Sequence, residues 1–292
     1  MAEAAYGSTT THRPGPVYVD EVEERRLLDH GHGMIRSETR AAIRLTAYLL
    51  LTLSLIPVQA FAVLFRLRLA ERLPRFYHRL CTRILGIQVV VRGRRVRERP
   101  VLFVANHVSY LDITALGSVV TGGFIAKSEV AGWPLFGILA KLQRTVFIAR
   151  KRTAVAKHGD EIAQRLEAGD NLILFPEGTS GDGTRVLPFK SAFFSVAERR
   201  PRGQALTVQP VSIAYTRLNE VPLGRGLRPF FAWYGDMDLL PHLWTVAALG
   251  KLTVVIEFHA PVTVDEVGSR KALATKVQDQ VAGGLARANA GR

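Results

Sequence analysis

An uncharged apolar stretch lies near the N-terminus of this chain and limits the structures that it can form. Residues 45–65 (LTAYLLLTLSLIPVQAFAVLF) number 21 and carry no charge. As a helix they extend about 31 Å, which matches a bilayer hydrocarbon core of about 30 Å. A buried helix of a soluble protein is the alternative, whereas a signal peptide fits poorly because 44 residues precede the stretch. The stretch is therefore predicted to associate with a membrane, and Pro57 either kinks a single span or marks the turn of a re-entrant hairpin.

The next segment carries most of the positive charge. The 292 residues include 39 Lys and Arg against 25 Asp and Glu, a net charge of +14, and residues 66–99 contribute +9 of it. Apolar positions recur there at helical spacing beside a ridge of arginines. This pattern favours a helix in the headgroup layer whose arginines reach lipid phosphates; a solvated basic helix packed on its own domain is the alternative. The apolar positions are Phe65, Leu69, Leu73, Phe76, Leu80 and Ile84, and the ridge is Arg68, Arg72, Arg75, Arg79 and Arg83.

Composition excludes several classes of protein. A single cysteine, Cys81, rules out a disulfide framework, a cysteine-based zinc site and an iron–sulfur cluster. The histidines show no metal-binding spacing, so no metal site is expected. Nucleic acid is not an expected partner, because no recognition motif is present and the basic segment directly follows the membrane segment.

The excess of arginine after the apolar stretch predicts that the C-terminal bulk lies in the cytosol. The three tryptophans, Trp133, Trp233 and Trp244, are interpreted as core or interface residues.

Three regions follow from these patterns. Residues 1–33 are predicted to be a disordered tail, and residues 34–85 membrane-anchoring helices, apolar over 45–65 and basic over 66–85. Residues 86–292 alternate strands and helices, which predicts an α/β fold with a mostly parallel sheet flanked by helices. The predicted strands are 88–91, 101–105, 145–148, 171–175, 206–214, 228–233 and 252–258, and the predicted helices are 109–119, 134–142, 154–168 and 264–289.

One candidate for chemistry follows the apolar strand 101–105. His107 and Asp112 are five positions apart, at the end of a strand where sites of doubly wound sheets lie. In the structural interpretation, Ser109 caps the following helix and Asp112 completes a capping box. In the functional interpretation, Asp112 turns back to His107, fixes the imidazole tautomer and leaves the other ring nitrogen as a base.

A second candidate follows the apolar strand 171–175. The residues Phe175-Pro-Glu-Gly-Thr179 combine a strand end, a proline, an acid and a glycine, which predicts a tight turn that presents Glu177. A plain strand-to-loop turn is the alternative. The two motifs together, about 70 residues apart and in this order, are far more specific than either one.

In these motifs the chain resembles the glycerolipid (lysophospholipid) O-acyltransferases, across roughly residues 86–260. The family's His-x4-Asp block matches His107 and Asp112, and its Phe-Pro-Glu-Gly-Thr block matches residues 175–179 completely. Its second block, usually Gly-x-x-Phe-Ile-Asp-Arg, appears as 144–150 (RTVFIAR), and its fourth as 208–211 (VQPV). Lys127 also lies where the family has a basic residue.

The resemblance implies a fold, an activity and a set of roles. His107 would be the general base toward an acceptor hydroxyl, Asp112 would orient it, and the oxygen would attack an acyl thioester directly. The acceptor's polar head would be held by Glu177, Gly178, Thr179, Arg150 and Lys127. The implied partners are a lysolipid acceptor, an acyl carrier protein or coenzyme A thioester as donor, and the bilayer, with no further cofactor. The implied location is the cytosolic face of a bacterial inner membrane.

Departures from the family pattern bear on the acceptor. Many relatives continue the Phe-Pro-Glu-Gly-Thr block with an arginine that would bind phosphate bidentately, whereas this chain has Ser180. Arg144 and Ala149 replace the Gly and Asp of the Gly-x-x-Phe-Ile-Asp-Arg block. Arg185 and Lys190 are candidates to replace the missing clamp. The sequences of residues 106–112, 127–137 and 233–239 are most similar to those of bacterial acyltransferases of lyso-ornithine lipid, an aminolipid without phosphate.

Two other functions remain open at the level of sequence. A non-enzymatic protein could use residues 66–99 to bind anionic membranes, and it would show no turnover. A lipid esterase would need a nucleophile, and no Gly-x-Ser-x-Gly elbow is present. The sequence leaves open the acceptor (lyso-ornithine lipid or lysophosphatidate), the donor, the acyl length, the oligomeric state and the choice between span and hairpin.

Overall fold

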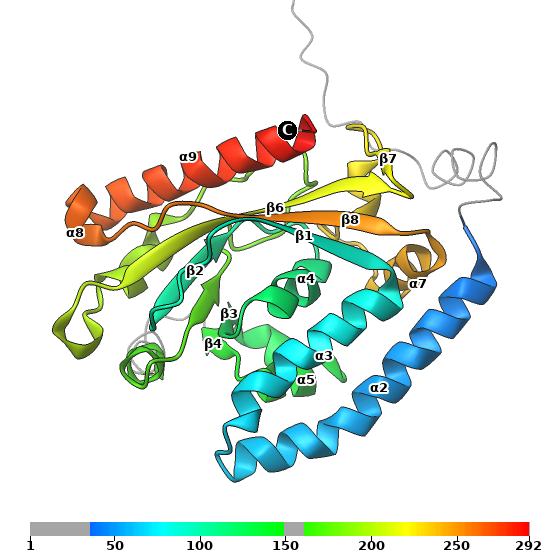
Figure 1. The fold of residues 1–292 in the computed structure, drawn as a ribbon, viewed down its shortest axis with the longest axis horizontal. Coiled ribbons are helices and arrows are strands. Elements are labelled where there is room, and N and C mark those ends of the chain that lie inside the picture. The colour runs from blue at the N-terminus through cyan, green and yellow to red at the C-terminus, as the bar shows by residue number, and fades with distance from the viewer. Residues whose placement is uncertain (1–35, 149–160, 292) are drawn as a thin grey trace, which may run out of the picture.

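A single mixed sheet forms the centre of the computed structural model, which describes residues 36–148 and 161–291 (Figure 1). Within these residues the strand order is β1-β8-β6-β2-β5-β3-β4, with β7 paired to β6. All neighbouring pairs are parallel except β6 with β8 and β6 with β7. The strands are β1 (Ile87–Gly93), β2 (Val101–Ala105), β3 (Gly123–Lys127), β4 (Val146–Ile148), β5 (Leu172–Leu174), β6 (Thr207–Leu218), β7 (Val221–Pro222) and β8 (Leu252–Phe258).

Helices cover both faces of this sheet, so the predicted α/β class is confirmed. Strand β2 is buried along its whole length, with Val101, Phe103 and Ala105 in one core and Leu102 and Val104 in the other. The first core packs under α4 and the second under α9 (Figure 1). The helices are α2 (Glu38–Leu64), α3 (Leu69–Leu85), α4 (Leu111–Val119), α5 (Phe136–Leu142), α7 (Leu239–Ala248), α8 (Val264–Val267) and α9 (Arg270–Asn289), with short 3-10 turns η1 (Ser128–Gly132), η2 (Ser191–Glu198), η3 (Pro201–Gly203) and η4 (Arg228–Phe231).

Helices α2 and α3 form an antiparallel pair outside α4 and α5 (Figure 1). Ser37 caps α2 by accepting a hydrogen bond from the amide of Arg40. Helix α2 is long and apolar enough to cross a membrane, and little of it is buried within the protein. These properties indicate that α2 associates with a membrane. Residues 45–64 of the predicted apolar stretch lie within α2, and Phe65 is the residue that follows it. The predicted tail, residues 1–33, lies outside the described residues.

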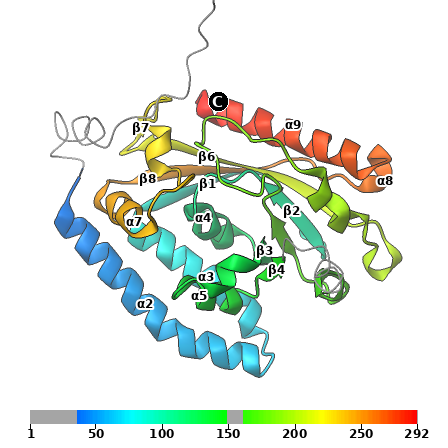
Figure 2. The same ribbon diagram turned by 180° about the vertical axis from the view of Figure 1, so that it is seen from behind.

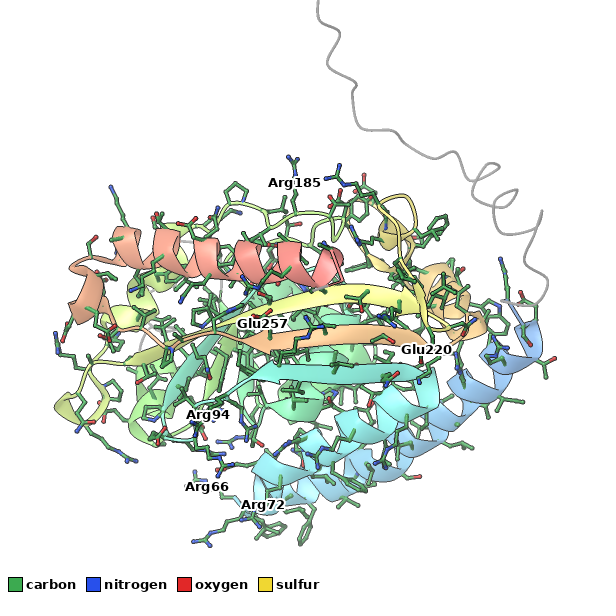
Figure 3. The ribbon with its side chains drawn as sticks, turned by 45° about the horizontal axis from the view of Figure 1, so that its top comes forward. Arg66, Arg72, Arg94, Arg185, Glu220 and Glu257 are labelled. Atoms are coloured by element: carbon green, nitrogen blue, oxygen red, sulfur yellow. The ribbon has the colours of Figure 1, made fainter. Side chains whose placement is uncertain are left out.

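The predicted apolar face of residues 65–84 is divided in the structure. Leu73 is buried, but Leu69 and Phe76 are about half exposed. Helix α3 packs on α4 as well as α2, so its buried side turns toward Cys81 and Leu85. Figure 3 shows Arg66 and Arg72 at the α2–α3 end of the molecule, with Arg94 above them in this view.

Most predicted strands and helices have counterparts, but two predictions were wrong. Residues 228–233 were predicted as a strand, and the structure has the 3-10 turn η4 there. Pro229 has no amide hydrogen for a sheet ladder, which disfavours a strand. Residues 264–289 were predicted as one helix, and the structure has α8 and α9, separated at Gly268 with φ +80°. Helix α7 was not predicted, and of the predicted helix 154–168 the described part, 161–167, is helical.

Candidate active site

The two sequence motifs meet at the carboxyl edge of the sheet. Parallel strands β2 and β5 are neighbours, so Asn106 after β2 and Phe175 after β5 emerge side by side. The side chain of Asn106 donates to the carbonyl of Ile213 at 2.9 Å and accepts from its amide at 2.8 Å. These two bonds attach the start of the His107 loop to β6 and fix its direction.

The carboxylate of Asp112 holds the His107 ring. Its Oδ2 lies 2.8 Å from His107 Nδ1 and also accepts the amides of Val108 at 2.6 Å and Ser109 at 2.9 Å. An Nδ1–H that donates to this oxygen leaves Nε2 as the acceptor nitrogen. The ring keeps 22% of its surface exposed while Asp112 has none. The pair can therefore take up a proton from a group that reaches His107.

The capping box expected from Ser109 does not form. Helix α4 begins at Leu111 and has no side-chain cap; Ser109 Oγ only accepts a long bond of 3.4 Å from the Leu111 amide. The Asp112 carboxylate instead accepts hydrogen bonds from the amides of Val108 and Ser109. One carboxylate therefore connects the loop to the first turn of α4 and also orients the imidazole. Of the predicted capping box only the contact of Asp112 with the Ser109 amide is present, whereas the predicted contact of Asp112 with the His107 ring is observed.

Tyr215 is a residue of this site that the motif analysis missed. Its hydroxyl donates to the second oxygen of Asp112, Oδ1, at 2.7 Å, and its side chain is buried. Burial, with the nearby carboxylate, raises the pKa of Tyr215 well above its usual value, so it remains a donor. No sequence signal identifies it, because Tyr215 lies on β6 and meets Asp112 only through the sheet order.

Glu177 is buried rather than displayed on the loop. Its Oε2 accepts the amide of His107 at 3.2 Å and its Oε1 accepts the amide of Leu187 at 3.1 Å. Burial raises the pKa of Glu177 to about 8, and the charge of Asp112 adds to this rise. The carboxyl group thus joins the two motifs through backbone contacts, while its predicted role of gripping the acceptor stays a prediction.

The other predicted binding residues lie around this centre. Gly178 has φ +69°, and a Cβ there would lie 3.0 Å from Lys190 Nζ, so the ammonium lies against the turn. Thr179 is exposed. Lys127 ends β3, two strands from β2 at the same sheet edge, and is also exposed. Arg150 lies outside the described residues, and Arg185 points away from the body of the protein (Figure 3).

Ser180 occupies the position of the family's arginine, and its hydroxyl is engaged elsewhere. It donates to the carbonyl of Trp233, whose amide in turn donates to the carbonyl of Val108 at 3.0 Å. The next residue, Gly181, donates its amide to the carbonyl of His107 at 2.9 Å. Residues 180–181 and 233 thus enclose the His107 loop, and Ser180 supplies no charge to it.

An apolar cavity of about 190 Å³ lies on the same side of the sheet, and stacked aromatic rings connect its wall to His107. The imidazole stacks on Phe175 with ring centroids 4.3 Å apart, and Phe175 stacks on Phe124, which lines the cavity. Helices α2, α3 and α5 supply most of the wall. A space of this chemistry suits a hydrocarbon chain. Among residues 36–148 and 161–291 no cluster of three metal-ligating side chains occurs.

Comparisons with known proteins identify the family and the fold of this chain. Residues 88–214 match the family model described as Acyltransferase. The chain is 44% identical over 257 residues to the lyso-ornithine lipid O-acyltransferase of Brucella abortus, covering 87% of this chain and 96% of that protein. It is 33% identical to the 1-acyl-sn-glycerol-3-phosphate acyltransferase of Neisseria gonorrhoeae, covering 68% and 73%. The crystal structure of the 1-acyl-sn-glycerophosphate acyltransferase PlsC from Thermotoga maritima superposes with a TM-score of 0.54 at 26% identity, covering 84% and 97%.

Proposed function

This chain belongs to the acyltransferase family, and from that membership we propose that it is a lysolipid O-acyltransferase whose acceptor is lyso-ornithine lipid. The observation that carries the proposal is the imidazole of His107, bonded to buried Asp112 and connected through stacked Phe175 to Phe124 in the wall of an apolar cavity. Transfer of a fatty chain to a hydroxyl requires a base near a site for hydrocarbon, and Phe175 and Phe124 connect the two here.

The proposed reaction needs no covalent enzyme intermediate. Nε2 of His107 removes the proton of the acceptor hydroxyl while that oxygen attacks the thioester carbonyl carbon. The tetrahedral intermediate then breaks its carbon–sulfur bond, and the leaving thiolate takes the proton from the imidazolium. The products are the acylated lipid and a free thiol. The one cysteine, Cys81, is fully buried on α3, which supports direct transfer.

The nature of residue 180 supports an acceptor without phosphate. The serine hydroxyl is bonded to the Trp233 carbonyl and brings no charge toward the His107 loop. Relatives named lyso-ornithine lipid O-acyltransferases reach 44% and 40% identity, above the 33% of the matched 1-acyl-sn-glycerol-3-phosphate acyltransferase. Lysophosphatidate is the competing acceptor. The variant Ser180→Arg should lower the KM for lysophosphatidate and should not improve turnover of lyso-ornithine lipid.

The proposal extends to the donor and the membrane side. The donor is a soluble acyl thioester of acyl carrier protein or coenzyme A, and the catalytic domain lies on the cytosolic face of a bacterial inner membrane. The arginines of residues 66–99, directly after the apolar stretch, support this side.

The test measures thiol release by the full chain in detergent, with each thioester and each lysolipid, and scores products by mass. Release should require a lysolipid. His107→Ala should lower turnover about 10²–10⁴-fold, whereas His259→Ala, which removes a buried imidazole on the α9 side of the sheet, should retain it. Binding of lipid with no turnover, indifferent to His107, would instead identify a non-enzymatic membrane-binding protein.

A further inference from the structure

Side chains from three separate segments form an aromatic surface to which the proposed chemistry assigns no role. Trp133 follows η1, Trp233 follows η4, and Trp244 lies on α7. The rings of Trp133 and Trp233 meet edge to face with centroids 5.8 Å apart, and Trp233 Nε1 donates to the carbonyl of Met237 at 2.8 Å. The tryptophan surface is defined as Trp133, Trp233, Tyr234, Met237, Leu240 and Trp244.

Much of the apolar area of the tryptophan surface is uncovered. Leu240 is 70% exposed, and Trp133, Tyr234, Met237 and Trp244 are each 37–38% exposed. Leu240 and Trp244 are four residues apart on α7, so they share one face of that helix. Contiguous exposed patches of this kind mark contact sites rather than ordinary surface.

The tryptophan surface is continuous with the membrane-associated helix. Helix α7 packs against α2: Arg40 and Arg44 donate to carbonyls at the end of α7, and Trp244 Nε1 donates to Glu38 at the start of α2. Figure 2 shows α7 and α5 on the same side of the molecule, both beside α2. The outer face of α2 is itself apolar and exposed, for example at Ile43, Leu50 and Leu53.

We propose that the tryptophan surface is a second bilayer-contacting surface, which lies in the headgroup region beside α2. Tryptophan and tyrosine are amphipathic and concentrate at membrane–water interfaces, and α2 brings this surface to the bilayer. Asp236 and Asp238 are exposed in the same loop. Because their carboxylates must stay hydrated, the surface rests at the boundary of headgroups and acyl chains and does not enter the hydrocarbon centre.

This position gives lipid chains a short path to the cavity. Trp133 lines the apolar cavity and belongs to the tryptophan surface, and Leu239, next to Leu240, also lines it. A chain can then pass from the bilayer into the cavity without crossing water, a consequence that rests on the proposed function. Contact of the surface with the bilayer does not rest on it, so the two can fail separately.

The test uses the intrinsic fluorescence of the full chain on phosphatidylcholine vesicles. The chain has three tryptophans, and all three belong to the tryptophan surface, so the emission reports on this surface alone. Vesicles of brominated phosphatidylcholine should quench the emission by about half or more, and bromines near the head of the acyl chain should quench more than bromines near its end. Co-sedimentation establishes that the protein is bound in both cases.

A pair of variants tests the assignment to these residues. Met237→Asp with Leu240→Asp should reduce the bromolipid quenching at least twofold, and Leu240→Asn alone should reduce it partly with little risk to folding. Val221→Asp, at a valine that is 66% exposed on β7, should leave the quenching unchanged. The proposal would be overturned if bromolipid did not quench the emission of bound protein. It would also be overturned if a second copy of the chain shielded the tryptophans.

Discussion

At the scale of single residues, the site depends on how one carboxylate is surrounded. Asp112 accepts four hydrogen bonds: three on Oδ2, from the His107 ring and the amides of Val108 and Ser109, and one on Oδ1, from Tyr215. The His-x4-Asp spacing predicts the first of these, because it is local. Tyr215 is 103 residues away from Asp112, and a residue brought in by the pairing of β2 with β6 leaves no local signal in a single sequence.

Tyr215→Phe tests the Oδ1 contact as a positioning contact. Without the hydroxyl, Oδ1 of the buried carboxylate loses a hydrogen-bond donor, so the negative charge of Asp112 stabilises the imidazolium of His107 more strongly. The carboxylate also loses a contact that fixes its orientation. We expect kcat to fall about tenfold, since hydrogen bonds to charged groups are worth about 1.5–3 kcal/mol. We also expect the acid limb of the kcat/KM profile to move to higher pH, measured by thiol release.

The matched control for this prediction lies on the same strand. Ser212→Ala removes another buried hydroxyl from β6, one that contacts His259 and the carbonyl of Val281 on the α9 side. It should lower stability without moving the pH profile. A Tyr215→Phe enzyme with an unchanged profile and only a lower melting temperature would show that Tyr215 has a purely structural role.

Glu177 predicts a specific dependence of stability on pH. Burial raises the pKa of Glu177 from the ordinary 4.5 to about 8. Between these values the folded chain holds a proton that the unfolded chain releases, so this group makes the free energy of unfolding fall as pH rises from 4.5 to 8.

The variant Glu177→Gln isolates that contribution. The amide does not titrate, so wild type should lose stability relative to the variant across this range, by up to about 4 kcal/mol given 1.36 kcal/mol per pKa unit. Melting temperatures of both proteins at pH 5 and pH 8 measure it. A stability difference that is constant with pH would contradict the raised pKa.

At the scale of elements, α3 shows where helical periodicity is informative and where it stops. The spacing of apolar residues predicts the helix correctly, but it does not reveal that α3 has two neighbours. The predicted arginine ridge also makes contacts within the protein. Arg75 and Arg79 donate to the carbonyl of Ser118 at 3.3 and 3.1 Å, and Arg95 donates to Val119. These carbonyls lie at the C-terminal end of α4, where the negative end of the helix dipole attracts cations.

Substitution of these arginines should therefore reduce stability. We expect Arg75→Gln with Arg79→Gln to lower the free energy of unfolding by about 1–3 kcal/mol, because carbonyls at the end of α4 lose charged donors. Thermal unfolding in detergent measures the change. Arg83→Gln, on the exposed side of the same helix, is the control and should have an effect within about 0.5 kcal/mol. Equal effects would show that the ridge acts only through its charge.

At the scale of the whole molecule, the placement of α2 was beyond sequence reasoning. An uncharged stretch of this length fits a perpendicular span, yet α2 is attached to the catalytic domain near both ends. Arg44 donates to the carbonyl of Leu249 at 2.7 Å near the start, and Gln59 donates to the carbonyl of Leu142 at 2.8 Å near the end. These contacts are tertiary and polar, and hydropathy does not record them.

That attachment predicts that both ends of α2 lie on one side of the membrane. A perpendicular span would draw α5 and α7 into the hydrocarbon, where their polar loops would lose hydration. We therefore expect α2 to lie within one leaflet, with its apolar face toward the lipid chains and its inner face on the domain. Cysteines placed at Thr39 and Arg68, both exposed, report on the two ends once Cys81 is replaced by alanine.

A membrane-impermeant maleimide should label both cysteines in inside-out vesicles and neither one in intact cells whose outer membrane has been made permeable. Retained acyl transfer shows that each variant is folded. Labelling of Thr39→Cys and Arg68→Cys from opposite sides would mean that α2 crosses the bilayer, and the contacts of Arg44 and Gln59 with the domain would then have to break in the membrane. The polar bonds at both ends of an otherwise apolar helix argue that they do not.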